Sequence, residues 1–370
     1  MIVLIRCNNI LSDPRAMKYV KYLRESGKKY MLIGWDREGN TPDQPNTYYF
    51  RDKAGFNVGG FKAVSNRVKW MWYVYKTLKS INKKCLTLHC CDLDAAYPAA
   101  IYKQLIDKES LLIFDVFDWF SDTLYNQNAI IVAAMKYMEK ISVRQSDYII
   151  ICEPERKEQI PYVIPSEKLK VLPNIPYFQD SAFLHKDKNY EFHNDLITFS
   201  YVGGFSEDRC LDTIIHIAKD GYINLAIAGF GNERIEKNLN NLKGHPNIRY
   251  YGKVKYQDGL QIMYNSDIVY AMYSIANPNN VYAAPNKYYE ALLLGKPLVT
   301  TKGTLVEKKV QKSDIGYTIG EDVEELRVLI CSLDRKDMDI KGGKAHDLWE
   351  SKFKNYLADF FNHVYTNIIK

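Results

Sequence analysis

Lys287 and Glu290 lie three residues apart in the stretch PNKYYEALLLGKP (285–297), which is otherwise largely apolar. Residues three apart share one face of a helix, so both charges would lie on the same side near its start. Pro285 suits a first helical turn, and Ala284 before it cannot cap the free amides. The amides at the helix start are therefore free to bind an anion, and Lys287 would meet its negative charge. Glu290 would accept hydrogen bonds from a neutral diol such as a ribose.

A glycine pair marks a second candidate for anion binding. YVGGFSEDRC (201–210) is typical of a strand, then Gly203 and Gly204, then a helix start. The glycines would let the backbone approach a ligand closely, and Arg209 could hold a diphosphate with its forked guanidinium. An ordinary tight turn with an exposed arginine is the alternative.

A third stretch, AGFGNER (228–234), places Gly229 and Gly231 in a G-x-G pattern after a strand. Arg234 stands where a dinucleotide fingerprint has its third glycine, which disfavours a dehydrogenase. Alone, the pattern favours a plain turn between a strand and a helix.

The composition permits a two-domain protein with ordinary cores. The chain has 370 residues, 46% of them apolar, and a net charge of +6. This charge is smaller than nucleic-acid binders usually carry, so no nucleic-acid partner is expected, but it suits an anionic substrate or membrane surface. Seven cysteines without a C-x-x-C pattern indicate free thiols in a reducing cytosol. No signal peptide and no membrane-spanning helix are expected.

Short apolar runs alternate with helical patterns along most of the chain, which predicts an α/β fold with parallel sheets. In the first helical pattern, Ser12 or Asp13 caps the start, Pro14 occupies the first turn and Gly27 follows the end. The expected strands are 1–5, 30–34, 85–89, 111–117, 147–152, 197–204, 224–231, 247–252, 267–273, 296–300 and 315–319.

The alternation breaks in a polar, proline-containing stretch before it restarts. We expect two Rossmann-like, doubly wound domains of 1–178 and 196–342 that face each other across a cleft, joined by a linker of 179–195. The last segment, 343–370, has one amphipathic helical pattern, and we expect it to pack back on the first domain.

In this order and spacing, "YVGGFSEDR", "IAGFGNE" and above all "PNKYYEALLLGKPLV" resemble the retaining family 4 glycosyltransferases of GT-B fold, of the bacterial surface-glycan type. "SDPRAMKYVKYL", "LHCCDLDAAYPAA", "FDVFDWFSD" and "VLPNIP" in the first half agree. The resemblance implies a nucleotide diphosphate sugar, with UDP slightly favoured, held by the second domain and an acceptor held by the first. It implies no cofactor and no metal.

Carried over by position, the resemblance assigns roles to single residues. Glu290 would bind the donor ribose, Arg209 the diphosphate, and Lys287 would assist Arg209 at the leaving group. Donor-binding residues would be Gly203, Gly204, Arg209, Gly229, Gly231, Asn286, Lys287 and Glu290. Arg15, Asp92 and Asp118 would lie on the acceptor side, with Asp92 and Asp118 as further candidates for catalysis.

Three positions depart from the family pattern. Tyr282 stands where many relatives have a second glutamate, and Cys210 stands where many have a lysine after the phosphate-loop arginine. Phe117 occupies the place where a cleft histidine is often found. These departures concern the donor sugar and the catalytic groups more than the nucleotide.

Asp92 and Asp94 form a D-x-D, which in the other large glycosyltransferase fold holds a metal on the donor diphosphate. Here the pair lies in the first domain, away from the donor motifs, which disfavours a metal site. Asp92 follows a strand directly, so it either faces the cleft or caps a helix. His89, at the same strand end, belongs either to the core or to the cleft.

Residues 66–84, NRVKWMWYVYKTLKSINKK, form a basic helical pattern rich in aromatic residues. We expect an inner stripe of Val68, Met71, Trp72, Tyr75 and Leu78. Lys69, Trp70, Tyr73 and Lys76 would then face outward and contact an anionic membrane surface. A core helix with a solvated lysine face is the alternative.

The sequence thus predicts a cytoplasmic, metal-independent hexosyltransferase that associates peripherally with the inner face of the cell membrane. Its acceptor would be a lipid-linked or surface polysaccharide (capsule) intermediate. The alternatives are a catalytically silent GT-B partner subunit and a nucleotide-sugar epimerase.

Overall fold

The computed structural model describes residues 1–53, 60–81, 83–124, 127–176 and 183–369. The chain divides into two compact units. Unit 1 comprises Met1–Pro173 and Leu357–Lys370, and unit 2 comprises Asn174–Tyr356. Of the expected linker, residues 179–182 lie outside the described part, and the remainder belongs to unit 2.

Unit 1 contains a parallel sheet with the strand order β3-β2-β1-β4-β5-β6-β7. All five strands expected here are present, and two further strands, β3 and β7, extend the sheet at its edges. Both edge strands are short and partly exposed, so they lack the apolar run that marks a buried strand. The strands are β1 Ile2–Arg6, β2 Tyr30–Trp35, β3 Thr47–Phe50, β4 Thr87–Cys91, β5 Leu111–Val116, β6 Tyr148–Ile151 and β7 Leu169–Val171.

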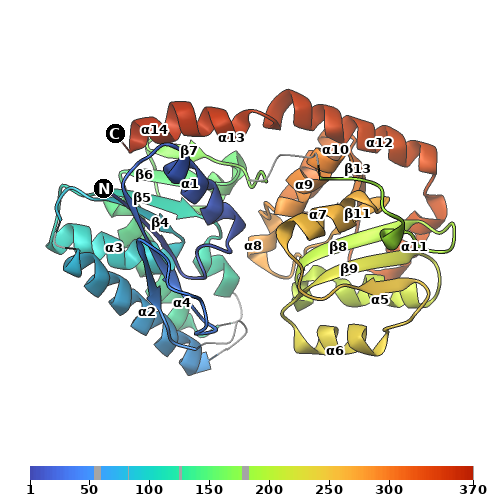
Figure 1. Cartoon of the computed structure of the whole chain (residues 1–370), viewed down its shortest axis with the longest axis horizontal. Helices are drawn as coiled ribbons and strands as arrows, with labels where there is room; N and C mark the ends of the chain where they lie inside the picture. Colours follow the sequence, from blue (N-terminus) through green and yellow to red (C-terminus); the bar gives the residue numbers. More distant parts are fainter. Residues whose placement is uncertain (54–59, 82, 125–126, 177–182, 370) are drawn as a thin grey trace. The chain divides into compact units, whose positions relative to one another are not determined.

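Helices cover both faces of this sheet. Three helices, α2, α3 and α4, form one layer on one face, while α1 and the C-terminal segment lie on the other (Figure 1). Their bounds are α1 Pro14–Glu25, α2 Gly60–Ser80, α3 Leu93–Leu105 and α4 Ala129–Gln145, with short 3₁₀ turns at Phe120–Leu124 and Pro154–Gln159.

The first helix begins where the sequence indicates. Of the two candidate caps, Asp13 is the one used: its side chain accepts hydrogen bonds from the backbone amides of Arg15 and Ala16, both at 3.0 Å. Pro14 is the first helical residue, and Gly27 follows the end with a φ of 63°.

The orientation expected for α2 is wrong. Trp70, which was expected to face outward, is 0% exposed and stacks on Trp35, whereas Trp72 is 56% exposed. Tyr73 is partly buried against the same core. Apolar residues lie on every side of this helix, so periodicity alone fits more than one orientation. Contact with Trp35 and Phe50, which belong to β2 and β3, selects the face that carries Trp70.

Unit 2 contains a second parallel sheet with the strand order β10-β9-β8-β11-β12-β13. If the strands are counted from the start of each unit, the first six have the same order in both sheets. The strands are β8 Thr198–Gly204, β9 Asn224–Phe230, β10 Ile248–Tyr250, β11 Ile268–Ala271, β12 Leu298–Thr301 and β13 Gly316–Ile319, all expected from the sequence.

Helices alternate with these strands as the pattern predicts. They are α5 Leu211–Lys219, α6 Glu233–Asn241, α7 Tyr256–Tyr264, α8 Pro278–Val281, α9 Asn286–Leu294, α10 Leu305–Ser313, α11 Val323–Ser332 and α12 Arg335–Leu348. Short 3₁₀ turns cover Lys188–Tyr190 and Glu207–Arg209. The α/β fold class with two doubly wound parallel sheets is thus confirmed.

The helical end of the chain continues from α12 through short segments into unit 1. These segments are Trp349–Phe353, Tyr356–Asp359, Phe360–Tyr365 and Thr366–Ile368. In unit 1 the Thr366 hydroxyl lies 2.5 Å from the Tyr22 hydroxyl, and the ring of Phe361 stacks on that of Tyr22 at 4.8 Å. In the part of the chain that the structure describes, no helix is both long and apolar enough to span a bilayer.

Candidate functional site

The residues expected to bind the donor gather at the carboxyl ends of β8 and β11, which are neighbouring parallel strands. The carboxyl ends of neighbouring parallel strands meet at one edge of a sheet, where α/β proteins commonly bind ligands. The loop after β8 carries Arg209. The segment after β11 leads through the short helix α8 into α9, which carries Lys287 and Glu290.

Lys287 is buried beside the glycines of the β8 loop. Only 8% of its surface is exposed, and its Nζ lies 4.4 Å from the centre of the Tyr201 ring. The same Nζ lies 2.7 Å from the point that a Cβ on Gly203 would occupy, so a side chain at 203 would displace the ammonium group. The backbone of Gly203 thus makes the room that Lys287 fills.

Three charged groups of unit 2 act on one another at this edge. Burial, followed by the positive charge of Arg209, lowers the pKa of Lys287 to about 8, and Glu290 opposes this shift. Glu290 is itself only 6% exposed. Two cations, Arg209 and Lys287, are therefore brought together with Glu290 at this edge.

Arg209 is held by the loop after β11. Its guanidinium carbon lies 4.5 Å from the centre of the Tyr273 ring, and its Nη1 is 3.4 Å from Asp208 and 3.5 Å from Asn280. Since 27% of its side chain is exposed, Arg209 keeps access to solvent while one side is packed. The guanidinium therefore remains accessible to an anion from solvent.

Helix α9 has no side-chain cap. The expectation that Pro285 lies in the first turn is wrong by one residue: Pro285 is the N-cap and Asn286 the first helical residue. As the N-cap, Pro285 offers no side-chain oxygen to the first amides of the helix, as was expected of Ala284 one residue earlier. The positive end of the helix therefore points at the same edge as Lys287.

The G-x-G turn supports the β8 loop from the side. A Cβ on Gly229 would lie 1.8 Å from the carbonyl oxygen of Gly203, so only glycine fits there. The Phe205 amide donates to the Phe230 carbonyl at 2.8 Å, and the Gly231 amide donates to Glu236 at 2.7 Å. The first of these bonds joins the two loops, and the second holds the G-x-G turn against the start of α6.

Asp208 joins the two loops of the site and was missed by the sequence reasoning. Its Oδ2 accepts from Asn280 Nδ2 at 2.9 Å, its carboxylate also accepts from the Ser206 hydroxyl, and its carbonyl accepts from the Ser274 amide at 2.8 Å. Burial tends to raise its pKa, but Arg209 and these hydrogen bonds outweigh burial and lower it. The only signal in the sequence was the unusually polar loop SIANPNN, which supplies the partners.

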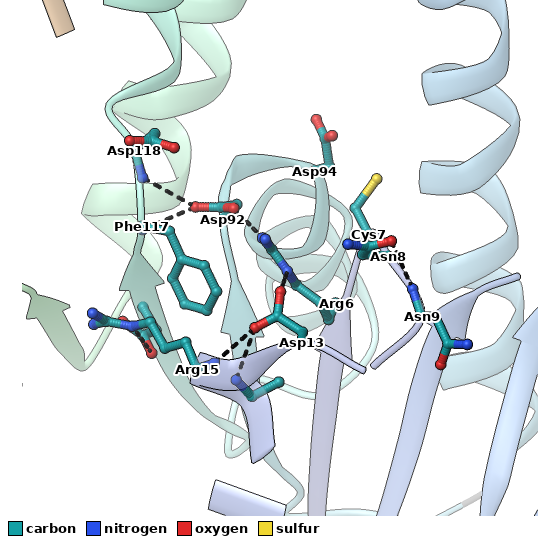
Figure 2. A network of polar contacts seen from close by, with 12 residues as sticks. Arg6, Cys7, Asn8, Asn9, Asp13, Arg15, Asp92, Asp94, Phe117 and Asp118 are labelled. Atoms are coloured by element: carbon teal, nitrogen blue, oxygen red, sulfur yellow. Dashed lines mark hydrogen bonds and ion pairs between the residues drawn. The ribbon is translucent and has the colours of Figure 1, made fainter. Parts of the chain in front are cut away.

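The aspartates of unit 1 form a separate network at the ends of β1, β4 and β5 (Figure 2). Arg6 pairs with Asp13 at 2.7 Å and with Asp92, whose other oxygen accepts from the Phe117 amide at 2.9 Å. Asp92 precedes α3 but makes no capping hydrogen bond, so the capping alternative is excluded.

Asp92 has an unusual backbone and an unusual acidity. Its φ of 70° and ψ of 171° are costly for a residue with a side chain, and such strain is found mostly at functional sites. Burial raises the pKa of Asp92 to about 6; Arg6 opposes this effect and Asp118 adds to it. Asp118 is more than half exposed, and its carboxylate lies 3.4 Å from the guanidinium of Arg156.

Arg15 is buried in unit 1. Its guanidinium forms a forked contact with Asp115, at 2.5 and 3.3 Å, and donates to the Leu172 carbonyl at 3.1 Å. The ring of Phe117 lies between Arg15 and Arg6, 4.7 and 4.3 Å from the two guanidinium carbons (Figure 2). Phe117 thus packs against both arginines.

The D-x-D motif does not present two carboxylates to one point. Asp92 pairs with Arg6, whereas Asp94 pairs with Arg67 at 2.7 Å and points away from Asp92 (Figure 2). His89 is a core residue with 0% exposure, which settles its two alternatives.

His89, Cys91 and Asp115 are the one group in the described part of the chain with metal-ligand spacing. The Asp115 carboxylate already pairs with the Arg15 guanidinium and accepts a hydrogen bond from the Tyr19 hydroxyl at 2.7 Å. A metal ion bound there would therefore lie next to a positively charged arginine. The chemistry of this donor set does not fit a metal.

The fold is the GT-B fold of glycosyltransferases. Solved structures that match the whole chain include sucrose-phosphate synthase from Thermosynechococcus elongatus, with a TM-score of 0.74, 14% identity, and coverage of 99% of this chain and 98% of that chain. Anabaena HepE in complex with UDP-glucose matches with a TM-score of 0.67 and 12% identity over 99% of both chains.

The lipopolysaccharide outer core galactosyltransferase WaaB also matches, with a TM-score of 0.58, 15% identity, and coverage of 99% of this chain and 100% of that chain. In sequence, no known family profile and no curated protein matches the chain. At these identities the structural likeness establishes the fold.

Proposed function

We propose that the protein is a retaining glycosyltransferase of the family 4 type that uses a nucleotide diphosphate sugar. The observation that carries this proposal is the convergence of Arg209, Lys287 and the uncapped start of α9 at one sheet edge. Within the described residues, no carboxylate lies within 4.0 Å of Lys287 Nζ. A buried ammonium group without an ion pair is costly unless an anion is bound, and a diphosphate would supply that charge.

In the proposed reaction the bond between the sugar's anomeric carbon and the diphosphate oxygen breaks, and a bond to the acceptor oxygen forms. Negative charge develops on the leaving diphosphate, where Arg209, Lys287 and the α9 amides would stabilise it. The acceptor proton passes to an oxygen of that phosphate, so no protein base is required. Glu290 would hold the ribose, and Asp92 and Asp118 of unit 1 would contact the acceptor.

UDP is the nucleotide that we favour for the donor, because solved structures of the matching Anabaena HepE hold UDP and UDP-glucose. Titration of the protein with UDP, GDP and dTDP in a calorimeter tests the donor site. Binding of none of the three would exclude it.

Arg209→Lys gives a sharper test, because lysine keeps the charge but loses the fork. Turnover should fall more than donor affinity if Arg209 acts on the leaving group. An intact kcat would return Arg209 to a surface role.

We further propose that transfer needs no divalent metal, because Arg209 and Lys287 supply positive charge at the diphosphate. Activity in excess EDTA should then be unchanged. Loss of activity that Mn²⁺ or Mg²⁺ restores would contradict this and reopen the question of Asp92 and Asp94.

For the acceptor we propose a lipid-linked or surface-glycan intermediate, met at the cytoplasmic face of the membrane. All seven cysteines are free thiols, as suits a reducing compartment. Release of UDP from UDP-sugars only when a glycan acceptor is added would support transfer. Conversion of the sugar without acceptor would favour an epimerase instead.

A catalytically silent partner subunit is favoured by one observation, Tyr282 at the second-glutamate position. UDP binding without release of any product would support that alternative.

A further inference from the structure

One layer of unit 1 carries charge of nearly one sign. Helices α2, α3 and α4 contain nine lysines and arginines, five on α2, one on α3 and three on α4. Their two carboxylates, Asp94 and Glu139, are only 6% and 1% exposed. The outward side of this layer is therefore basic, and among the described side chains these three helices expose no carboxylate of their own.

Most of these basic side chains form no ion pair among the described residues. The structure describes the side chains of eight of them, and three are paired: Arg67 with Asp94, Lys69 with Asp52 and Lys103 with Asp147. The other five have no carboxylate within 4.0 Å among the described residues; they are Lys76, Lys79, Lys136, Lys140 and Arg144.

Large apolar side chains are exposed in the same layer. Val68 and Trp72 on α2 are each 56% exposed, and Ile130 and Tyr137 on α4 are 78% and 61% exposed. Leu105 at the end of α3 is 67% exposed. They account for most of the large apolar side chains that the described part of unit 1 exposes.

The apolar and basic groups share stripes. Val68, Trp72, Lys76 and Lys79 follow one another at spacings of four, four and three residues, which places them on one side of α2. Lys76 Nζ lies 5.2 Å from the centre of the Trp72 ring, and Tyr75 stacks on that ring at 5.7 Å. On α4, Ile130, Tyr137 and Arg144 recur every seven residues and form a second stripe.

We propose that the outward side of the α2–α3–α4 layer docks on a bilayer that contains anionic phospholipid. Lysine stems can lie along an apolar surface while their ammonium groups reach phosphates, and Trp and Tyr favour the interface between headgroups and acyl chains. Of the nine basic residues, seven are lysines, which protein–protein interfaces tend to avoid, so a lipid surface fits better than a protein partner.

The proposal extends the proposed function, because such docking would bring the enzyme to a lipid-linked acceptor. It replaces the docking residues expected from the sequence: Trp72 takes the place of Trp70, which is in the core, and Tyr73 is partly buried. Lys69 and Lys76 remain on the exposed side, although Lys69 is paired with Asp52.

Trp72 gives the docking face its own reporter. Of the five tryptophans, the other four, Trp35, Trp70, Trp119 and Trp349, are at most 2% exposed. Insertion of Trp72 into a headgroup region should shift the tryptophan emission to shorter wavelength. We expect this shift when vesicles of phosphatidylcholine mixed with phosphatidylglycerol are added, and no shift in Trp72→Phe.

Co-sedimentation with the same vesicles measures binding directly. The wild type should pellet with anionic vesicles but not with pure phosphatidylcholine, and high salt should release it. Trp72→Ser with Lys76→Glu and Lys79→Glu should weaken binding at least tenfold. Tyr137→Ser with Lys136→Glu and Lys140→Glu should also weaken it, and serves as the second variant if the first fails to fold.

The matched control lies in unit 2: Val328→Ser with Lys308→Glu and Lys312→Glu removes one apolar side chain that is 69% exposed and changes the net charge equally. This control should bind within twofold of the wild type. Wild type that stays in the supernatant with anionic vesicles at low salt would overturn the proposal, and so would equal loss in the control. UDP titration of the same samples reports the donor site independently, so that failure of docking and failure of the proposed function are distinguished.

Discussion

The two sheets of this protein share one strand order for six strands, but they use charged residues differently at their carboxyl ends. In unit 1, Arg15 is matched by Asp115, and Arg6 by Asp13 and Asp92. In unit 2, Lys287 is buried with no carboxylate within 4.0 Å among the described residues. A buried cation without an ion pair costs free energy, which is the feature on which the proposed anion site rests.

The helices of the two units also differ in charge balance, but here unit 1 is the one with unpaired basic residues. The α-helices of unit 2, α5 to α12, carry twelve basic and eleven acidic residues, close to balance. The α2–α3–α4 layer of unit 1 carries nine and two. With the same strand order, the two units thus differ in where unpaired positive charge lies: at the strand ends in unit 2 and on a helical layer in unit 1.

The largest effect is expected from breaking the buried pair of unit 1. Asp115→Ala should destabilise the protein by about 3–5 kcal/mol, because it leaves the Arg15 guanidinium buried without its carboxylate. Arg15 holds the pKa of Asp115 well below its usual range, although burial acts against this. Urea unfolding followed by tryptophan fluorescence measures the change. A loss below about 1 kcal/mol would mean that the pair is not structural.

In unit 2 a comparable change should affect binding rather than stability. Glu290→Ala should weaken UDP binding by about 1.5–3 kcal/mol, since a charged hydrogen-bond partner of the ribose is lost. Calorimetry with UDP measures the change, and Glu290→Gln is the isosteric control. Unchanged affinity together with lower stability would make Glu290 structural and remove the contrast between the units.

Lys287→Met should remove a pH dependence. Burial lowers the pKa of Lys287 to about 8, so the free protein should take up about half a proton when it binds UDP at pH 8. Above pH 8 the affinity for UDP should fall by up to about tenfold per pH unit. The stability of the free protein should change with pH in the opposite direction to UDP binding. Above pH 8 the folded state binds fewer protons than the unfolded state, so the free energy of unfolding should rise with pH there.

The methionine variant should show neither effect, and its unfolding free energy at pH 7 should equal or exceed that of the wild type. Titration in two buffers of different ionisation enthalpy measures the proton uptake. The same uptake in Lys287→Met would place the titrating group elsewhere.

The smallest effect concerns Asp92. Because its pKa in the folded state is raised to about 6 by burial, its contribution to stability is greatest in acid and is lost as the pH rises through 6. Asp92→Asn should flatten this part of the pH profile by less than about 1 kcal/mol, since the side chain is 21% exposed. Unfolding free energies at pH 4, 5, 6 and 7 test the slope, and an unchanged profile would contradict the assignment.

The buried elements were predictable because their signal is local. Every expected strand is present, because a short apolar run between turn residues favours a buried strand. Helix α1 begins after Asp13, with Pro14 as its first residue, and Gly27 follows its end, as the capping preferences of these residues predict. The edge strands β3 and β7 could not be found, because pairing with a neighbour defines them more than their own residues do. The orientation of α2 depended on Trp35, which is distant in sequence.

The candidate site was predictable to a similar degree. Motif order placed Arg209, Lys287 and Glu290 at one edge, which local patterns and the family resemblance together indicate. Asp208 and Arg6 were missed because their roles depend on partners from other loops, Asn280 in one case and Asp92 in the other. Long-range pairing of this kind leaves no spacing signal in the sequence.

The end of unit 1 has a consequence for synthesis. Residues 174–356 lie between the two parts of this unit, and Tyr365 in the second part brings its hydroxyl to 2.7 Å from the buried Nδ1 of His89. On a ribosome, the first 173 residues would therefore emerge without the segment that covers Tyr19 and His89. They would have to wait, incompletely folded, until the whole of unit 2 had been translated. Unit 1, whose synthesis begins first, would therefore complete its folding after unit 2.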